Sequence, residues 1–215
     1  MAYRVLTIDR EFGSGGARIA QKIATWLGWR LLDGEFIAAI ASAAQADPQV
    51  VSQYDERSNS LANRMAPRTL RRTINPINPV NPIEPIEPAA ERSVFFDADR
   101  MTEITRKVVE EAHVKGDCVI VGRGAQCILQ YKDDVYHAFV YAPFAERLHR
   151  LQLRLEPGAN IEQRIRTVDQ ERAEFLLQRF GKNWVNPQLY NLMICSSENE
   201  DRTARVLLYA MTGQL

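Results

Sequence analysis

The chain opens with a short apolar segment, a cluster of glycines and an amphipathic stretch, and this order constrains the fold more than any other feature. The apolar segment spans residues 5–8, the glycines lie at residues 13–16, and a helix is predicted from about Ala17. Glycines permit the tight backbone that turns successive N–H groups toward one point. A helix that begins there adds its own unpaired N–H groups and the positive end of its dipole. The segment therefore predicts a strand, a phosphate-binding turn and a helix, with a plain strand-to-helix loop as the alternative.

The glycine cluster does not meet the standard P-loop pattern, G-x-x-x-x-G-K-[ST]. When Gly13 and Gly15 are aligned with the inner glycines, Gly16 falls on the lysine and Arg10 on the first glycine. That lysine usually reaches the β- and γ-phosphates of the donor, so a cation is missing where negative charge gathers. We expect Arg10 or Arg18 to supply it, although Arg18 could equally face solvent on the first helical turn.

Composition excludes several classes of protein. The 215 residues carry 27 Lys and Arg against 27 Asp and Glu, so no net charge favours nucleic acid or an anionic membrane. Cys118, Cys127 and Cys195 have no metal-like spacing, and their odd number favours a reduced chain with small buried thiols. No apolar run has the length of a transmembrane helix, and the N-terminus lacks the apolar run of a signal peptide. We expect a soluble, cytoplasmic protein.

Strand and helix patterns alternate along the rest of the chain. Further strands are predicted at residues 29–32, 118–122, 135–141 and 189–195, and helices at about 36–44, 97–114, 144–155, 161–180 and 204–211. The segment 118–122 is apolar on both faces, which is typical of a central parallel strand. Strands separated by helices imply right-handed crossovers. The sequence therefore predicts an α/β fold, a five-stranded parallel sheet flanked by helices, in a single domain over residues 1–215.

Residues 74–88 break this alternation with five repeats of the form Ile/Val–Asn/Glu–Pro. Proline at every third position excludes a helix or a central strand, and the period matches polyproline II. Its apolar side chains would fall on one edge: Ile74, Ile77, Val80, Ile83 and Ile86. The segment is either a semi-rigid surface spacer or an edge that docks on another protein or a second copy of the chain. We expect a homodimer rather than a monomer.

Six segments, taken in order, resemble the cytidylate kinase-like family of P-loop nucleoside monophosphate kinases. Residues 8–20 are similar to the family's opening strand and turn, residues 29–34 to its second strand, and residues 119–125 to the segment whose arginine holds the acceptor phosphate. Residues 135–150 resemble the strand and helix that lead to the lid, residues 166–172 the lid arginines, and residues 184–197 the final strand. The resemblance covers most of the chain outside about 48–92.

The resemblance implies phosphoryl transfer from ATP, with Mg²⁺, to a nucleoside monophosphate, of which CMP and dCMP are the first candidates. It implies catalytic roles for Arg123, Arg166 and Arg172 and substrate contacts for Asp33, Arg123 and Asp169. The donor phosphates would lie against Arg10, Gly13, Ser14, Gly15, Gly16, Ala17 and Arg18, with Ser14 as a candidate Mg²⁺ contact and no dedicated metal site. It also implies an acceptor-site insertion at 48–92 and a lid-like helical segment at 156–186.

Several of these interpretations have alternatives. A spacing of three places Arg166, Asp169 and Arg172 along one flank of a helix. They are either lid residues or a ladder of ion pairs on the surface. Asp33 could bind the acceptor or simply terminate a strand. Gly124 stands where cytidylate kinases tend to have aspartate, so cytosine recognition is not carried over. Because the lysine is lost, a nucleotide-binding regulator is an alternative function, and an interaction protein that works through residues 74–88 is another.

Overall fold

The computed structural model describes residues 3–33, 98–154, 160–197 and 199–213. The helix predicted at 36–44, the insertion at 48–92 and the proline repeat at 74–88 lie outside these residues. Within the described ranges, strands and helices alternate along the chain as the sequence predicts.

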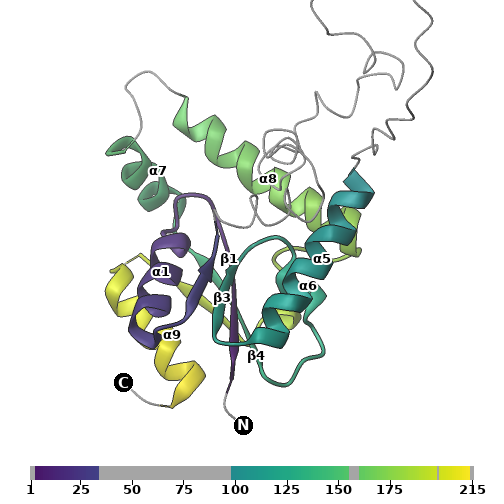
Figure 1. Ribbon diagram of the computed structural model, residues 1–215. Coiled ribbons are helices and arrows are strands. Elements are labelled where there is room, and N and C mark those ends of the chain that lie inside the picture. Colours follow the sequence, from purple (N-terminus) through teal and green to yellow (C-terminus); the bar gives the residue numbers. More distant parts are fainter. Residues whose placement is uncertain (1–2, 34–97, 155–159, 198, 214–215) are drawn as a thin grey trace, which may run out of the picture.

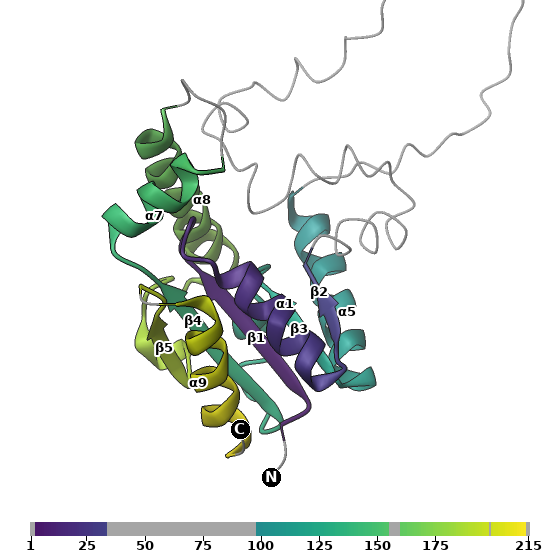
Figure 2. The same ribbon diagram turned by 90° about the vertical axis from the view of Figure 1, so that its left-hand side faces the viewer.

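Five strands of the described chain form one parallel sheet in the order β2-β3-β1-β4-β5, with three of them labelled in Figure 1 and all of them in Figure 2. They are β1 (Val5–Arg10), β2 (Arg30–Leu32), β3 (Cys118–Val121), β4 (Val135–Tyr141) and β5 (Leu192–Cys195). β1 is central because it pairs with β3 on one side and with β4 on the other. The predicted five-stranded parallel sheet is confirmed.

Helices cover both faces of this sheet, and two more lie beyond its carboxyl end (Figure 1; Figure 2). α1 (Gly16–Leu27) and α9 (Glu200–Thr212) pack side by side on one face, and α5 (Ala98–Lys115) and the short α6 (Ala125–Ile128) on the other. α7 (Phe144–Gln152) and α8 (Ile161–Phe180) lie at the carboxyl end of the strands, and a 3₁₀ turn, η2 (Pro187–Leu189), precedes β5. Parallel strands thus direct all their carboxyl ends toward α7 and α8.

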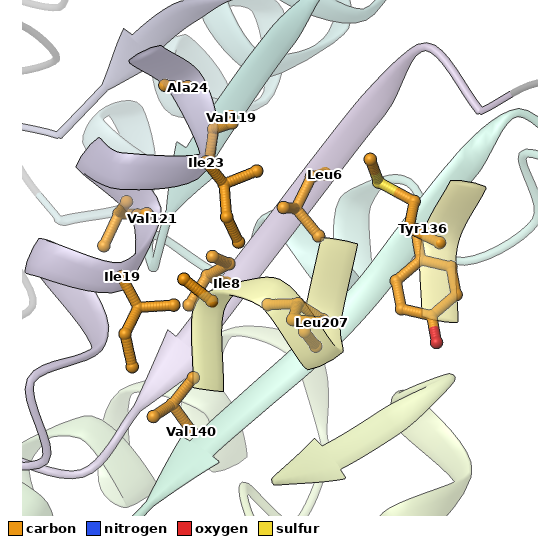
Figure 3. Packing of buried hydrophobic residues seen from close by; sticks show 14 residues of the cluster. Leu6, Ile8, Ile19, Ile23, Ala24, Val119, Val121, Tyr136, Val140 and Leu207 are labelled. Atoms are coloured by element: carbon orange, nitrogen blue, oxygen red, sulfur yellow. The ribbon is translucent and has the colours of Figure 1, made fainter. Parts of the chain in front are cut away.

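The apolar core is divided by the sheet because successive side chains of a strand point to opposite faces. Leu6 and Ile8 of β1 face α1 and α9, where they pack with Ile19, Ile23 and Leu207 (Figure 3). The alternate residues Val5, Cys118 and Ile120 pack against α5 and α6 instead. Each fully buried aliphatic side chain contributes about 1.5–3 kcal/mol of hydrophobic free energy. Burial on both faces confirms that the strand predicted at residues 118–122, which the structure has at Cys118–Val121, lies in the interior.

Two further properties of the described residues bear on function. The three cysteines are free thiols, with Cys118 buried and Cys127 and Cys195 half-buried. None of the helices in the described ranges combines the length and the apolar character that crossing a membrane requires.

Candidate active site

A cavity of about 370 Å³ lies at the carboxyl end of the sheet, which is where open parallel sheets bind ligands. Its walls are the glycine turn (residues 13–16), the end of β1, and side chains from the region of α7 and α8. Among the described residues, five arginines line it against one acidic side chain, Glu11; they are Arg10, Arg18, Arg154, Arg164 and Arg172. The cavity is therefore suited to a polyanionic ligand.

The glycine turn leaves backbone N–H groups open at the start of α1. Gly13 and Gly15 both have φ near +83°, the left-handed region that favours glycine. α1 begins without a side-chain cap and without an acidic residue in its first turn. Ile19 donates its N–H to the Gly15 carbonyl, 3.0 Å away, whereas the N–H groups before it have no intrahelical acceptor. An anion at this point would accept those hydrogen bonds.

Ser14 is anchored through its backbone, but its hydroxyl is not. The Ser14 carbonyl accepts hydrogen bonds from Arg150 of α7, at 3.0 Å, and from the hydroxyl of Ser196 just beyond β5. Ser14 is fully buried, and its Oγ has no hydrogen-bond partner among the residues that the structure describes. A buried unsatisfied hydroxyl costs about 1–3 kcal/mol, so a ligand that bonds to Ser14 Oγ would recover that free energy.

Phe12, in the loop between β1 and the glycine turn, forms hydrogen bonds with both α7 and α8. Its N–H donates to the Asp169 carboxylate over 2.7 Å, and its carbonyl accepts from Arg147 Nη1 at 3.2 Å. Arg147 also forms an ion pair with Asp169, and its Nε lies 3.4 Å from Glu11 Oε2. Burial raises the pKa of Glu11, while a hydrogen bond from the N–H of Ala142 and the charge of Arg147 oppose the rise. Asp169 thus lies behind the loop, outside the cavity lining.

Three buried arginines gather between β1, β3 and α8. Arg10, Arg123 and Arg172 are each 4% exposed, and Arg172 Nη1 donates to the Arg10 carbonyl at 2.7 Å. Arg123 follows β3 with φ of +64°, which is uncommon for a residue other than glycine. The pKa of Arg123 is lowered to about 10, chiefly by burial and also by the charges of Arg10 and Arg172, while Asp33 acts in the opposite sense. Buried cations this close together favour an anion between them.

Two of the arginines singled out in the sequence do not belong to this buried group. Arg166 is exposed and lies over the Phe144 ring, 4.9 Å from its centroid, outside the cavity lining. Arg18 lines the cavity, but its side chain is 50% exposed and pairs with Glu200 of α9. The structure therefore brings Arg10, Arg123 and Arg172 together and leaves Arg166 apart.

Sequence reasoning missed several residues that shape the site. Arg164 lines the cavity beside Phe12, whose ring centroid lies 5.7 Å from the guanidinium carbon. Arg164, Val168 and Arg172 are spaced by four along α8, so the helical period could have identified Arg164 from Arg172. No helical period in the sequence pointed to Arg154.

Asp9 is a second omission, and it is the acid that orders the end of β1. Its carboxylate is 2% exposed and accepts hydrogen bonds from Gln126 at 2.7 Å and from the Trp184 indole at 2.9 Å. It also accepts from the Arg10 N–H at 2.8 Å and lies 3.7 Å from the Arg10 guanidinium. Asp9 is thus a positioning group rather than a candidate ligand.

Comparisons with known proteins agree with this architecture. Residues 5–198 match a model of the cytidylate kinase-like family. Among solved structures, an uncharacterized protein from Eubacterium ventriosum ATCC 27560 is similar with a TM-score of 0.64 and 18% identity, over 98% of each chain. A gluconokinase from Sinorhizobium meliloti 1021 follows with a TM-score of 0.54 and 9% identity, over 98% of this chain and 93% of that one.

A shikimate kinase from Bacteroides thetaiotaomicron has a TM-score of 0.50 and 12% identity, over 94% of this chain and 95% of that one. Identities this low establish a shared fold, that of the P-loop kinases, and nothing about substrates. Among curated proteins, none matches the chain.

Proposed function

Because the chain belongs to the cytidylate kinase-like family, we propose that it transfers the γ-phosphoryl group of ATP to a nucleoside monophosphate, with CMP and dCMP as the first candidates. One observation carries the proposal: a glycine turn, an open helix N-terminus and buried arginines meet at one cavity at the carboxyl end of the sheet. Phosphoryl transfer requires mainly the positioning of two substrates and the neutralisation of charge on the phosphates. These groups suit both tasks.

On the donor side, the N–H groups of the glycine turn and of Ala17 would hold the β-phosphate of ATP. Arg154, Arg164 and Arg172 would approach the outer phosphates from the opposite wall. The cavity lining supports this division, because Ala17 comes from the start of α1 and the three arginines come from the region of α7 and α8. Charge-assisted hydrogen bonds from arginine to phosphate are about twice as strong as neutral ones.

On the acceptor side, Arg123 would hold the phosphate of the nucleoside monophosphate, and Asp33 its base or ribose. An oxygen of that phosphate forms a bond to the γ-phosphorus while the bond from this phosphorus to the ADP oxygen breaks. Arginine's planar fork suits a phosphate better than a lysine ammonium does. Two observations support this assignment: Arg123 is buried at the end of β3, and the charge of Asp33 is close enough to raise the pKa of Arg123.

We propose that residues 156–186, which contain α8, form the lid. The kinase domain would span residues 1–215 and carry an acceptor-site insertion at 48–92. Arg172 already lines the cavity. Arg166 would leave the Phe144 ring and reach the phosphates as α8 moves. The bonds of Asp169 to Phe12 and Arg147 would couple such a movement to the loop before the glycine turn.

Mg²⁺ would arrive with ATP and neutralise charge on its phosphates. Ser14 fits such an ion because its buried hydroxyl lacks a hydrogen-bond partner within the described part of the chain. Across those same residues, no three side chains of the types His, Cys, Asp and Glu gather as a metal site would require. Because Mg²⁺ keeps several waters and binds the phosphates of its nucleotide, phosphate and water oxygens would supply most of the ligands.

A coupled assay of ADP release, run with ATP, Mg²⁺ and each nucleoside monophosphate in turn, tests the proposal. We expect turnover with CMP or dCMP. Arg123→Ala should lower the rate roughly tenfold or more, because one charge-assisted hydrogen bond contributes about 1.5–3 kcal/mol. Its melting temperature should change far less. A variant with full activity and a reduced melting temperature would make Arg123 a structural residue instead.

A catalytically weak, nucleotide-binding regulator is the second candidate, and the glycine at position 16 favours it because the lysine of the standard pattern is missing. The two candidates differ in one measurement. A regulator binds ATP, as calorimetry would detect, but releases no ADP with any monophosphate. A protein that binds no ATP at all would exclude both.

A homodimer formed through residues 74–88 is a separate proposal that rests on the repeat alone, since these residues lie outside the described ranges. Deleting the repeat should leave ATP binding intact and weaken self-association in a sedimentation experiment. If the deletion variant and the parent both sediment as monomers, the repeat is only a spacer.

A further inference from the structure

The backbone at position 16 does not itself require glycine. Gly13 and Gly15 have positive φ angles, whereas Gly16 does not. What excludes a larger residue is a neighbour: a Cβ atom at position 16 would lie 2.6 Å from Cβ of Arg10 and 3.0 Å from its Cγ. Cβ contacts under 3.0 Å are essentially never observed, and Cβ of Arg10 is fixed to the backbone of a central strand. A lysine at position 16 and the Arg10 side chain therefore exclude each other.

Arg10 is held in this place by buried contacts on the other side. Arg10 ends β1, where it is opposite Val140 of β4. The Asp9 carboxylate accepts a hydrogen bond from the Arg10 N–H and forms an ion pair with the Arg10 guanidinium. Asp9 is in turn fixed by Gln126 and Trp184. A cation that is 4% exposed and anchored in this way is positioned before any ligand arrives.

Arg18, the other candidate for the missing charge, has a different environment. Its side chain is 50% exposed and pairs with Glu200, which also lies 3.9 Å from Arg154. Arg10 instead lines the cavity beside Gly16 and is close enough to Arg123 for its charge to lower the pKa of Arg123. Arg10 thus lies between the glycine turn and the arginine assigned to the acceptor.

We propose that Arg10 takes the place of the P-loop lysine as the cation that contacts the phosphoryl group in transfer, and that Gly16 is glycine in order to admit it. The inference rests on the proposed function, because it names the cation of that same site. The donor cation is supplied here by the end of the central strand rather than by the first turn of the helix.

An exchange of the two side chains tests the proposal. ATP and Mg²⁺ are titrated calorimetrically into the full chain and into Arg10→Gly, Gly16→Lys and the double variant. We expect Arg10→Gly to bind ATP about 10- to 100-fold more weakly, the change that loss of one charged hydrogen bond produces. Gly16→Lys alone should also bind weakly, because the introduced lysine meets Arg10. The double variant, in which the introduced lysine has room, should regain at least tenfold over Arg10→Gly.

Two further variants separate binding from folding. Arg10→Lys keeps a cation and the same Cβ, so it should remain within about tenfold of the parent in ATP affinity. Lys22→Ala is the matched control, because Lys22 is a cation of α1 that pairs with Asp201 and does not line the cavity. Thermal unfolding of each variant shows whether a loss of affinity merely reflects a loss of fold.

Three results would overturn the proposal. Parental ATP affinity in Arg10→Gly, with a large loss in Arg18→Ala, would make Arg18 the cation while leaving the proposed function intact. A folded double variant with no recovery would show that a lysine at position 16 cannot replace Arg10. A parent chain that binds no ATP would remove the proposed function and the inference together.

Discussion

α1 and α9 lie side by side on one face of the sheet, and their N-termini meet near Glu200, yet the two helices begin in opposite ways (Figure 2). α9 begins at Asn199, whose side chain accepts hydrogen bonds from the N–H groups of Asp201 and Arg202. Acidic residues fill its first turn. α1 begins at Gly15 with no side-chain cap and no acid in its first turn.

The presence or absence of a side-chain cap decides whether the first N–H groups of a helix stabilise the fold or remain available to a ligand. A cap satisfies the first N–H groups locally and removes them from any anion. Asn160 caps α8 in the same way as Asn199 caps α9. Of these three helix starts, that of α1 is the one without a side-chain cap, and its first residues, Gly16 and Ala17, line the cavity, as the proposed phosphate site requires.

The largest effect is expected from Gly15→Ala, which closes the open helix start. Alanine in the left-handed region costs about 1–2 kcal/mol, and its Cβ would also meet the Glu200 carboxylate. We expect ATP affinity measured by calorimetry to fall at least tenfold, because the N–H groups of the turn must shift.

Gly28→Ala, at the other end of α1, is the matched control. Gly28 has φ of +67° and nothing within 4 Å of an added Cβ, so it carries the strain without the collision. Its ATP affinity should equal that of the parent. Equal losses in the two variants would mean that strain in α1, rather than the turn itself, controls binding.

A smaller effect is expected from Asn199→Ala, which removes the cap of α9. Loss of an N-terminal cap costs about 0.5–2 kcal/mol of folding free energy, to be measured by chemical denaturation. ATP affinity should not change, since Asn199 is not among the residues that line the cavity. A fall in affinity would show that the start of α9 belongs to the ligand site. The starts of α1 and α9 would then not differ in their part in ligand binding.

The smallest effect is expected from Lys22→Ala, which removes an ion pair between the two helices. Lys22 and Asp201 are 2.8 Å apart, with side chains that are 36% and 57% exposed. Exposed ion pairs contribute about 0–1 kcal/mol, so the free energy of unfolding should change by less than about 0.5 kcal/mol. A larger loss would mean that α1 depends on α9 for its position.

Most of the fold follows from local patterns in the sequence. Residues 135–141 and 161–180 form β4 and α8 with the predicted bounds, because apolar runs and helical periods are visible over those lengths. β1 extends two residues beyond the predicted strand. Asp9 and Arg10 are polar, and only their pairing with β4 shows that they continue it. α6 has four residues, too few for a period to be visible.

The site depends on partners far apart in the chain, so the sequence alone could identify only part of it. Arg123 could be predicted, because a basic residue after a buried strand must lie at the carboxyl end of the sheet. The partners of Asp9 could not, since Gln126 and Trp184 are 117 and 175 positions away. The placement of Asp169 behind Phe12, 157 positions away, was equally invisible.

The central place of β1 has a consequence for how the chain is made. β1 is synthesised first, but its neighbours β3 and β4 follow only after residues 118 and 135. At about 5–20 residues per second, roughly 7–26 s separate the synthesis of Arg10 from that of Tyr141.

During that interval the nearest cover for Leu6 and Ile8 is α1, through Ile19 and Ile23. The unit of β1, glycine turn and α1 is thus the first part of the kinase fold that the ribosome releases. Both of its strand edges stay open until β3 and β4 have been made, and until then they can pair with any other exposed strand.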